Sequence, residues 1–296
     1  MDTLTLFPCA KINLTMEVFG RREDGYHHIR SVMESVSLRD RLTIRRIPSG
    51  FRFHCSIPEL SGEDNLVVRA WRLLADRFAL AGAELELEKQ IPWGSGMGGG
   101  SSDCAGTLLG LARMFQLPLS LEELMKLGKS LGADVPFCLL GQPALAAGIG
   151  EILSPLPAGP QLELIILMPP ASFSTPEMYR RLDSRPEIPT PISLTSFLEG
   201  LEQGDVRQIT HGLLNHFEEA VPAPQLLKKA KDSLLAAGAW GASMTGAGAA
   251  VFGIFPDSAA ANRALDHLIL EKDWQIYRCH TLADPWSEQA QKEGTI

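Results

Sequence analysis

Residues 94–100 read GSGMGGG, and Ser101, Ser102 and Asp103 follow them directly. Five glycines in seven positions leave the backbone without side chains, so it can approach an anion closely. The helical pattern after the glycines would turn its unpaired N–H groups and positive dipole end toward the same point. A plain strand-to-helix turn needs only about one or two glycines. The segment therefore indicates a phosphate-binding loop.

The common phosphate-binding classes do not match this loop. Gly94, Gly96 and Gly99 satisfy G-x-G-x-x-G, but a dinucleotide-binding unit needs a continuous apolar strand before it and an acidic residue ~20 positions later. Residues 83–89 alternate instead, and a helical pattern lies where the acid would stand. No Lys-Ser/Thr pair follows the glycines, and the protein-kinase signatures H-R-D and D-F-G are absent.

The elements around the loop read as alternating strands and amphipathic helices. Apolar and polar residues alternate over 8–19, which predicts a half-buried strand, and the polar run RREDGYHH that follows suggests a turn. Asp64 or Asn65 caps a helix, and Ser120 with Glu123 forms a capping box for another. Alternating strands favour mostly antiparallel sheets.

The best domain boundary is SPLPAGP, residues 154–160. We expect two domains, 1–155 and 156–296, each with strands and helices. Beyond the boundary we predict a buried strand at 162–168, a helix at 225–237, strands at 242–245, 249–255 and 274–279, and a helix capped by Asp257 or Ser258. The fold class is α+β in two domains.

Composition limits the possible partners. The 296 residues carry 27 Lys and Arg against 35 Asp and Glu, a net charge of -8, which argues against a broad nucleic-acid surface but not against a nucleotide. The longest apolar stretches are far below the ~20 residues of a membrane span, and no signal peptide is visible. Five scattered cysteines without C-x-x-C indicate neither a disulfide framework nor a zinc knuckle, so we expect a cytoplasmic protein.

Several segments together resemble the GHMP kinase superfamily. They are PCAKINL at 8–14, GRREDGYHHIRSV at 20–32, IPWGSGMGGGSSD at 91–103, GADVPF at 132–137 and GASMTGAGAAVF at 241–252. The glycine loop and TGAG are typical of the superfamily. AKINL, DGYH and GADVPF are similar to the branch that phosphorylates 4-diphosphocytidyl-2-C-methyl-D-erythritol in the non-mevalonate isoprenoid pathway. The resemblance covers nearly the whole chain.

The resemblance implies an N-terminal domain like domain 2 of ribosomal protein S5 and a ferredoxin-like C-terminal domain. It implies ATP as phosphate donor, a cytidine diphosphate compound as acceptor at its 2-hydroxyl, and ADP and the 2-phosphate as products. One departure is Ala247, where the third glycine motif usually has serine. Ala247 removes a hydroxyl near the phosphates, while the backbone N–H groups remain.

The resemblance assigns Lys11 and Asp134 as the catalytic pair. Without it, Lys11 reads as a residue on a solvated strand face and Asp134 as a turn aspartate. In phosphoryl transfer the attacking hydroxyl must be held in line, and its proton needs an acceptor. A carboxylate beside a lysine is a weak base, so we expect positioning by Asp134 to contribute more than proton abstraction.

The resemblance also assigns the loop to ATP. The expected ATP-binding residues are Pro92, Gly94, Ser95, Gly96, Met97, Gly98, Gly99, Gly100, Ser101 and Ser102. Ser101 and Ser102 are expected to contact phosphate oxygens or to help place Mg2+, although both also suit a helix N-terminus. Since the sequence shows no carboxylate cage, we expect ATP to carry most of the Mg2+.

For the second substrate the resemblance indicates a cytosine pocket. The expected substrate-binding residues are Asn13, Tyr26, His27, Tyr179, Thr245, Gly246 and Gly248. Asn13 would face the methylerythritol group, Tyr26 and Tyr179 would sandwich the base, and His27 would bind the base edge. The alternative for Tyr179 is a helix-face contact with Leu182, and Phe173 is then the rival stacking residue.

Three other functions stay open on the sequence alone. The first is another GHMP kinase, of the homoserine or mevalonate type, although neither needs DGYH. The second is an inactive nucleotide-binding regulator, which the presence of both Lys11 and Asp134 disfavours. The third is a dinucleotide-binding oxidoreductase, which the alternating strand before the loop disfavours. The oligomeric state cannot be inferred.

Overall fold

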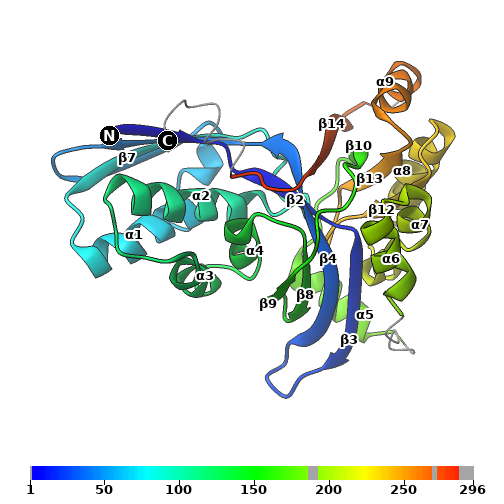
Figure 1. Ribbon diagram of the computed structural model, residues 1–296, viewed down its shortest axis with the longest axis horizontal. Helices are drawn as coiled ribbons and strands as arrows, with labels where there is room; N and C mark the ends of the chain where they lie inside the picture. The colour runs from blue at the N-terminus through cyan, green and yellow to red at the C-terminus, as the bar shows by residue number, and fades with distance from the viewer. Residues whose placement is uncertain (1, 186–192, 269–271, 287–296) are drawn as a thin grey trace.

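The computed structural model describes residues 2–185, 193–268 and 272–286. Figure 1 shows helices α1 to α4 on one side of the molecule and α6 to α9 on the other, with the long strand β4 between them. Strands and helices are mixed on both sides, so the predicted α+β class is confirmed. In the described part of the chain, no helix has the length and apolar character needed to cross a membrane.

The first half of the chain forms a helix-covered sheet. The four-stranded sheet has the order β1-β5-β7-β6, and α2 packs on β1, β5 and the neighbouring β2. The bounds are β1 Thr3–Leu6, β5 Arg41–Arg46, β6 Gly50–Cys55, β7 Gly82–Glu88, α1 Leu66–Phe78, α2 Gly99–Met114, α3 Leu121–Lys129 and α4 Val135–Leu140. Asn65 caps α1, and Ser120 with Glu123 forms the predicted capping box of α3. Strands β1 and β6 were not predicted.

A second sheet of ten strands joins the two sides of the molecule. Its main order is β11-β3-β4-β14-β10-β13-β12, and β4 also pairs with β2 and β8. The bounds are β2 Cys9–Asn13, β3 Thr15–Arg21, β4 His27–Arg39, β8 Ala144–Gly148, β9 Ile152–Pro155, β10 Glu163–Met168, β11 Leu214–Asn215, β12 Gly241–Met244, β13 Val251–Phe255 and β14 Gln275–Leu282. Among the described strand pairs only β11–β3 and β6–β7 are parallel, as expected of a mostly antiparallel fold.

The helices of the second half cover both faces of β10. The bounds are α5 Thr175–Asp183, α6 Thr195–Gln203, α7 Val206–His211, α8 Pro224–Ala236 and α9 Ser258–His267. Residues of α6 and α7 share one core cluster with Leu164 and Ile166, whereas residues of α8 and α9 share another with Ile165 and Leu167. Burial on both faces explains why β10 is a continuous apolar run. Asp257 caps α9, one of its two predicted caps. The segment after β9 contains the proposed domain boundary, which stays a prediction.

The predicted half-buried strand over 8–19 was wrong in two respects. The segment forms two strands, β2 and β3, and both are buried through Val18, polar positions included. The glycine loop covers β2, since the N–H of Lys11 donates to the carbonyl of Met97 at 2.9 Å. The polar residues of this segment therefore face the interior rather than water. The predicted turn is also shorter, because β3 continues to Arg21 and β4 begins at His27.

Candidate active site

The glycine loop connects β7 to α2 and lines a cavity of about 330 Å³. Gly98 directly precedes α2 with φ of +67°, and a Cβ there would lie 2.9 Å from Cγ of Lys11. Only glycine combines that backbone angle with so close a neighbour. Eight of the predicted ATP-binding residues line the cavity: Pro92, Gly94, Ser95, Gly96, Gly98, Gly99, Gly100 and Ser101.

Two predicted ATP-binding side chains are turned away from this cavity. Met97 is fully buried in the core, and its carbonyl accepts the hydrogen bond from Lys11. Ser102 is buried, and its Oγ donates to the carbonyl of Cys9 at 2.7 Å. The side chains of Met97 and Ser102 therefore point away from the cavity, because the first turn of α2 is hydrogen-bonded to β2 on that side. Their assignment to ATP stays a prediction. Ser101, by contrast, lines the cavity.

The sequence analysis missed a buried cluster of charged residues next to the glycine loop. Lys89 Nζ pairs with Asp40 and lies 2.7 Å from Oδ2 of Asp103, and all three side chains are at most 5% exposed. Lys89 and Asp103 also line the loop cavity. Asp40 holds the start of the loop, since its Oδ1 accepts from the N–H groups of Gln90 and Ile91. Asp103 ends the motif at 91–103, but no local pattern links it with Asp40 and Lys89, which lie at separate places in the sequence.

The cluster contains two carboxylates and one ammonium. Burial raises the pKa of Asp103 to about 8; the charge of Lys89 acts against this rise and that of Asp40 adds to it. Burial alone would lower the pKa of Lys89, but its two carboxylate partners raise that pKa above its ordinary value. Oδ1 of Asp103 is buried without a hydrogen-bond partner. The raised pKa therefore favours a protonated Asp103 beside the Lys89 ammonium.

The structure brings Lys11 and Asp134 together, as expected. Lys11 Nζ lies 3.4 Å from Oδ2 of Asp134 and donates to Oδ1 of Asn13 at 2.7 Å. Lys11 is almost fully buried, whereas the Asp134 side chain is 36% exposed. Asp134 precedes α4, yet its side chain makes no capping hydrogen bond. The carboxylate is thus open to a ligand rather than used to start the helix.

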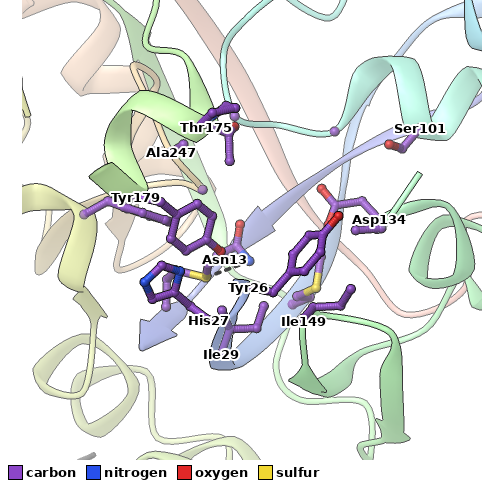
Figure 2. Close-up of a pocket in the computed structure, with 18 of the residues that line it drawn as sticks. Asn13, Tyr26, His27, Ile29, Ser101, Asp134, Ile149, Thr175, Tyr179 and Ala247 are labelled. Atoms are coloured by element: carbon purple, nitrogen blue, oxygen red, sulfur yellow. Dashed lines mark hydrogen bonds between the residues drawn. The ribbon is translucent and has the colours of Figure 1, made fainter. Parts of the chain in front are cut away.

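Lys11 and Asp134 lie in a second cavity of about 590 Å³. It shares Gly96, Gly98 and Ser101 with the loop cavity, so the two spaces meet at the start of α2. Figure 2 shows Ser101 and Asp134 on one side of this larger cavity and Tyr179 with His27 on the other. The larger cavity thus extends from the glycine loop to a group of aromatic side chains.

The predicted substrate residues near the loop divide into two groups. Asn13 and Gly246 line the larger cavity, and so does Ala247. Thr245 is fully buried and does not line the cavity; its Oγ1 accepts from the N–H of Asn13 at 3.0 Å. Gly248 also lies outside the lining, where a Cβ would meet Met244 and Phe173 within 2.8 Å. Direct contact of these two residues with substrate is therefore not supported, because both pack behind the residues that line the cavity.

The aromatic end differs from the expected arrangement. Tyr26, His27 and Tyr179 all line the cavity, but the ring parallel to Tyr179 is His27, with 4.8 Å between centroids and an interplanar angle of 11°. Tyr26 is 60% exposed and lies toward Asp134 (Figure 2). The two tyrosines therefore do not form a ready-made sandwich. Phe173, the rival residue, does not line the cavity.

Tyr179 is held firmly in place. Its ring stands nearly perpendicular to that of Phe217, with 5.0 Å between the ring centroids, and Tyr179 itself belongs to α5. Burial, and then the charge of Asp134, raise the pKa of Tyr179 to about 12, so the phenol stays neutral. His27 is fixed as well, since its Nε2 lies 2.6 Å from Oδ1 of Asp183. Asp183 was not among the predicted site residues.

Comparison with known proteins identifies the family of this chain. The family model described as GHMP kinases N terminal domain matches residues 65–142, and GHMP kinases C terminal matches residues 197–272. A 4-diphosphocytidyl-2-C-methyl-D-erythritol kinase of Lachnoclostridium phytofermentans is 40% identical over 273 residues, covering 89% of this chain and 92% of the relative. The enzyme of the same name from Lachnospira eligens is 41% identical over 261 residues, covering 87% and 90%.

Solved structures show the same relationship. The crystal structure of a 4-(cytidine 5'-diphospho)-2C-methyl-D-erythritol kinase superposes with a TM-score of 0.81 at 34% identity, covering 94% of this chain and 99% of that one. A homoserine kinase from Cytophaga hutchinsonii has a TM-score of 0.70 at 19% identity, covering 96% of both chains, and shares the fold alone. The predicted GHMP kinase fold is confirmed. With its site and its closely similar relatives, this chain belongs to the 4-diphosphocytidyl-2-C-methyl-D-erythritol kinase family of the GHMP kinases.

Proposed function

We propose that this chain transfers the γ-phosphate of ATP to the 2-hydroxyl of 4-diphosphocytidyl-2-C-methyl-D-erythritol, giving the 2-phosphate and ADP. The observation that carries the proposal is the meeting of two cavities at Gly96, Gly98 and Ser101. One cavity has the glycine loop of a nucleotide site, and the other has the size and mixed lining of a small-molecule site. Lys11 and Asp134 stand beside their junction, where a phosphoryl group would pass.

In this proposal Asp134 holds the attacking hydroxyl and accepts its proton. The carboxylate is partly exposed and makes no capping bond, so an oxygen remains free for the substrate. The ammonium of Lys11 donates a hydrogen bond to Asn13 and lies next to the carboxylate of Asp134. There it would stabilise the negative charge on the transferring phosphoryl group. The pair acts mainly by positioning two reactants in line.

We propose that Mg2+ enters with ATP and neutralises the phosphate charge. The hydroxyl of Ser101 is the protein oxygen best placed to meet it, because it lines both cavities and has no hydrogen-bond partner among the described residues. An alcohol oxygen suits a hard cation, and Mg2+ usually takes few protein ligands beside the phosphates. No group of three or more His, Cys, Asp or Glu that suits a metal ion occurs in the ranges that the structure describes.

The cytidine diphosphate end would occupy the aromatic part of the larger cavity. Tyr26 offers an exposed ring for stacking, and His27 and Tyr179 form the opposite wall. Stacking of a base on an aromatic ring contributes about 1–3 kcal/mol. Asn13 lies next to Lys11 and would contact the methylerythritol hydroxyls. The exposed guanidiniums of Arg21 and Arg180 also line this cavity and suit the diphosphate.

A phosphorylation assay tests the function. Purified protein is given ATP, Mg2+ and one of three acceptors: the cytidyl diphosphate substrate, homoserine or mevalonate. We expect ADP formation with the first only, and the product should carry its new phosphate on the 2-oxygen. Turnover of homoserine or mevalonate instead would assign the other GHMP activities, and no turnover would favour an inactive regulator. A cytoplasmic location stays a prediction.

A further inference from the structure

Two side chains on one face of α5 contact the imidazole of His27. Tyr179 stacks on the ring, and Asp183, four residues later on the same helix face, lies 2.6 Å from Nε2. The His27 side chain is 9% exposed and that of Asp183 is 36% exposed. His27 begins β4, which is 156 positions away from Asp183 in the chain. Helix α5 thus sets both the plane and the rotation of this ring. Figure 2 shows Tyr179 lying against His27.

The chemistry of Asp183 decides which nitrogen of a neutral His27 carries the proton. An ionised carboxylate can only accept hydrogen bonds, so Nε2 must be the donor. The other nitrogen, Nδ1, then carries a lone pair. No further hydrogen bond of this imidazole occurs in residues 2–185, 193–268 and 272–286. The imidazole of a neutral His27 therefore keeps one free acceptor, Nδ1, and no free donor.

We propose that Asp183 is a positioning residue that fixes His27 as a hydrogen-bond acceptor, so that the site favours a pyrimidine bearing an amino group over one bearing a carbonyl. Cytosine has an amino group at position 4, which can donate to Nδ1. Uracil has a carbonyl at that position, which would face a second acceptor. This inference rests on the proposed function in placing a pyrimidine next to His27.

The test measures cytosine selectivity rather than binding alone. The nucleotide site is first saturated with a non-hydrolysable ATP analogue, and CDP and UDP are then titrated separately by calorimetry. Wild type should bind CDP more tightly than UDP by about 3–10-fold, the value of one neutral hydrogen bond. Asp183→Asn keeps the size of the side chain but can either donate or accept, so both states of His27 become possible. For this variant the ratio of the CDP affinity to the UDP affinity should fall close to one.

Two further variants separate this role from a general structural one. Glu177 is another carboxylate on α5; it pairs with Arg181 and lies outside the cavity lining. Glu177→Gln should therefore keep the wild-type ratio of CDP affinity to UDP affinity. Asp183→Ala removes the anchor altogether and should weaken CDP binding while leaving the affinity for the ATP analogue unchanged. Unchanged ATP-analogue affinity also shows that each variant is folded.

The possible results divide clearly. A selectivity ratio that falls in Asp183→Asn but not in Glu177→Gln supports the proposal. An unchanged ratio in Asp183→Asn, or equal losses of CDP and UDP binding, overturns it and leaves Asp183 as a packing contact. Wild type that turns over the cytidyl substrate without preferring CDP to UDP also overturns it, while the proposed function stands. Wild type that neither binds CDP nor turns over the substrate refutes both.

Discussion

Replacing Asp103 by asparagine should change how the stability of the protein depends on pH. In the folded protein the pKa of Asp103 is raised from 3.8 to about 8, chiefly by burial. Between these two values the folded state holds a proton that the unfolded chain has lost. Wild type is therefore penalised increasingly as the pH rises through this window. The asparagine side chain has nearly the same shape, carries no such proton and can still accept from Lys89.

The magnitude follows from linkage of one proton. The unfolding free energy of wild type should decline relative to that of Asp103→Asn by about 1.4 kcal/mol per pH unit. From pH 5 to pH 7 the difference in unfolding free energy changes by about 3 kcal/mol. This is a substantial fraction of a total stability of about 5–15 kcal/mol. The penalty levels off above pH 8, where the folded state also loses the proton.

Urea unfolding at pH 5, 6 and 7 is the suitable assay, since the midpoint and slope give the free energy at each pH. Asp76→Asn, a change of an exposed carboxyl on α1, serves as control and should run parallel to wild type. Parallel curves for wild type and Asp103→Asn would refute the reasoning. Such curves would mean that Lys89 keeps both buried carboxylates ionised.

Three further predictions concern catalysis and binding. Asp134→Asn should lose most turnover while its affinity for ATP stays within about a few-fold, because the residue acts on the hydroxyl; near-normal kcat would exclude the assignment. Gly98→Val should weaken ATP binding, because φ of +67° and the 2.9 Å approach of Lys11 leave no room for a branched side chain; unchanged ATP affinity in the folded variant would reduce the loop to a turn. Tyr179→Ala should weaken CDP binding by about 5–150-fold and Tyr179→Phe only mildly, since the ring both lines the cavity and supports His27; equal CDP affinities of wild type and Tyr179→Ala would show that the ring only packs.

Local features of the fold could be predicted because they depend on near neighbours in the chain. The glycine loop, the capping box at Ser120 and the cap at Asn65 each need only a few adjacent residues. The buried strand β10 was recognisable from its continuous apolar run. The motifs around Lys11 and Asp134 also indicated the family, and the structure brings these two side chains within 3.4 Å.

Burial of polar residues could not be predicted from the pattern of a strand. Lys11 and Asn13 alternate with apolar residues as on a solvated face, yet both are nearly inaccessible. These residues are covered by the glycine loop and by Thr245, which lies more than two hundred residues away in the chain. A periodic pattern indicates which residues share a face but not what packs on that face.

The sequence by itself determined the glycine loop, the α+β class and the kinase family, because those signals lie in short contiguous segments. Only the tertiary structure decided which polar groups become partners. Asp40, Lys89 and Asp103 form one cluster from three separate segments, and Asp183 reaches His27 across 156 positions. Hydrogen bonds and ion pairs need a few ångströms of separation and a buried setting to be strong. Those conditions are created by the way that strands and helices pack, and separation along the chain does not reveal them.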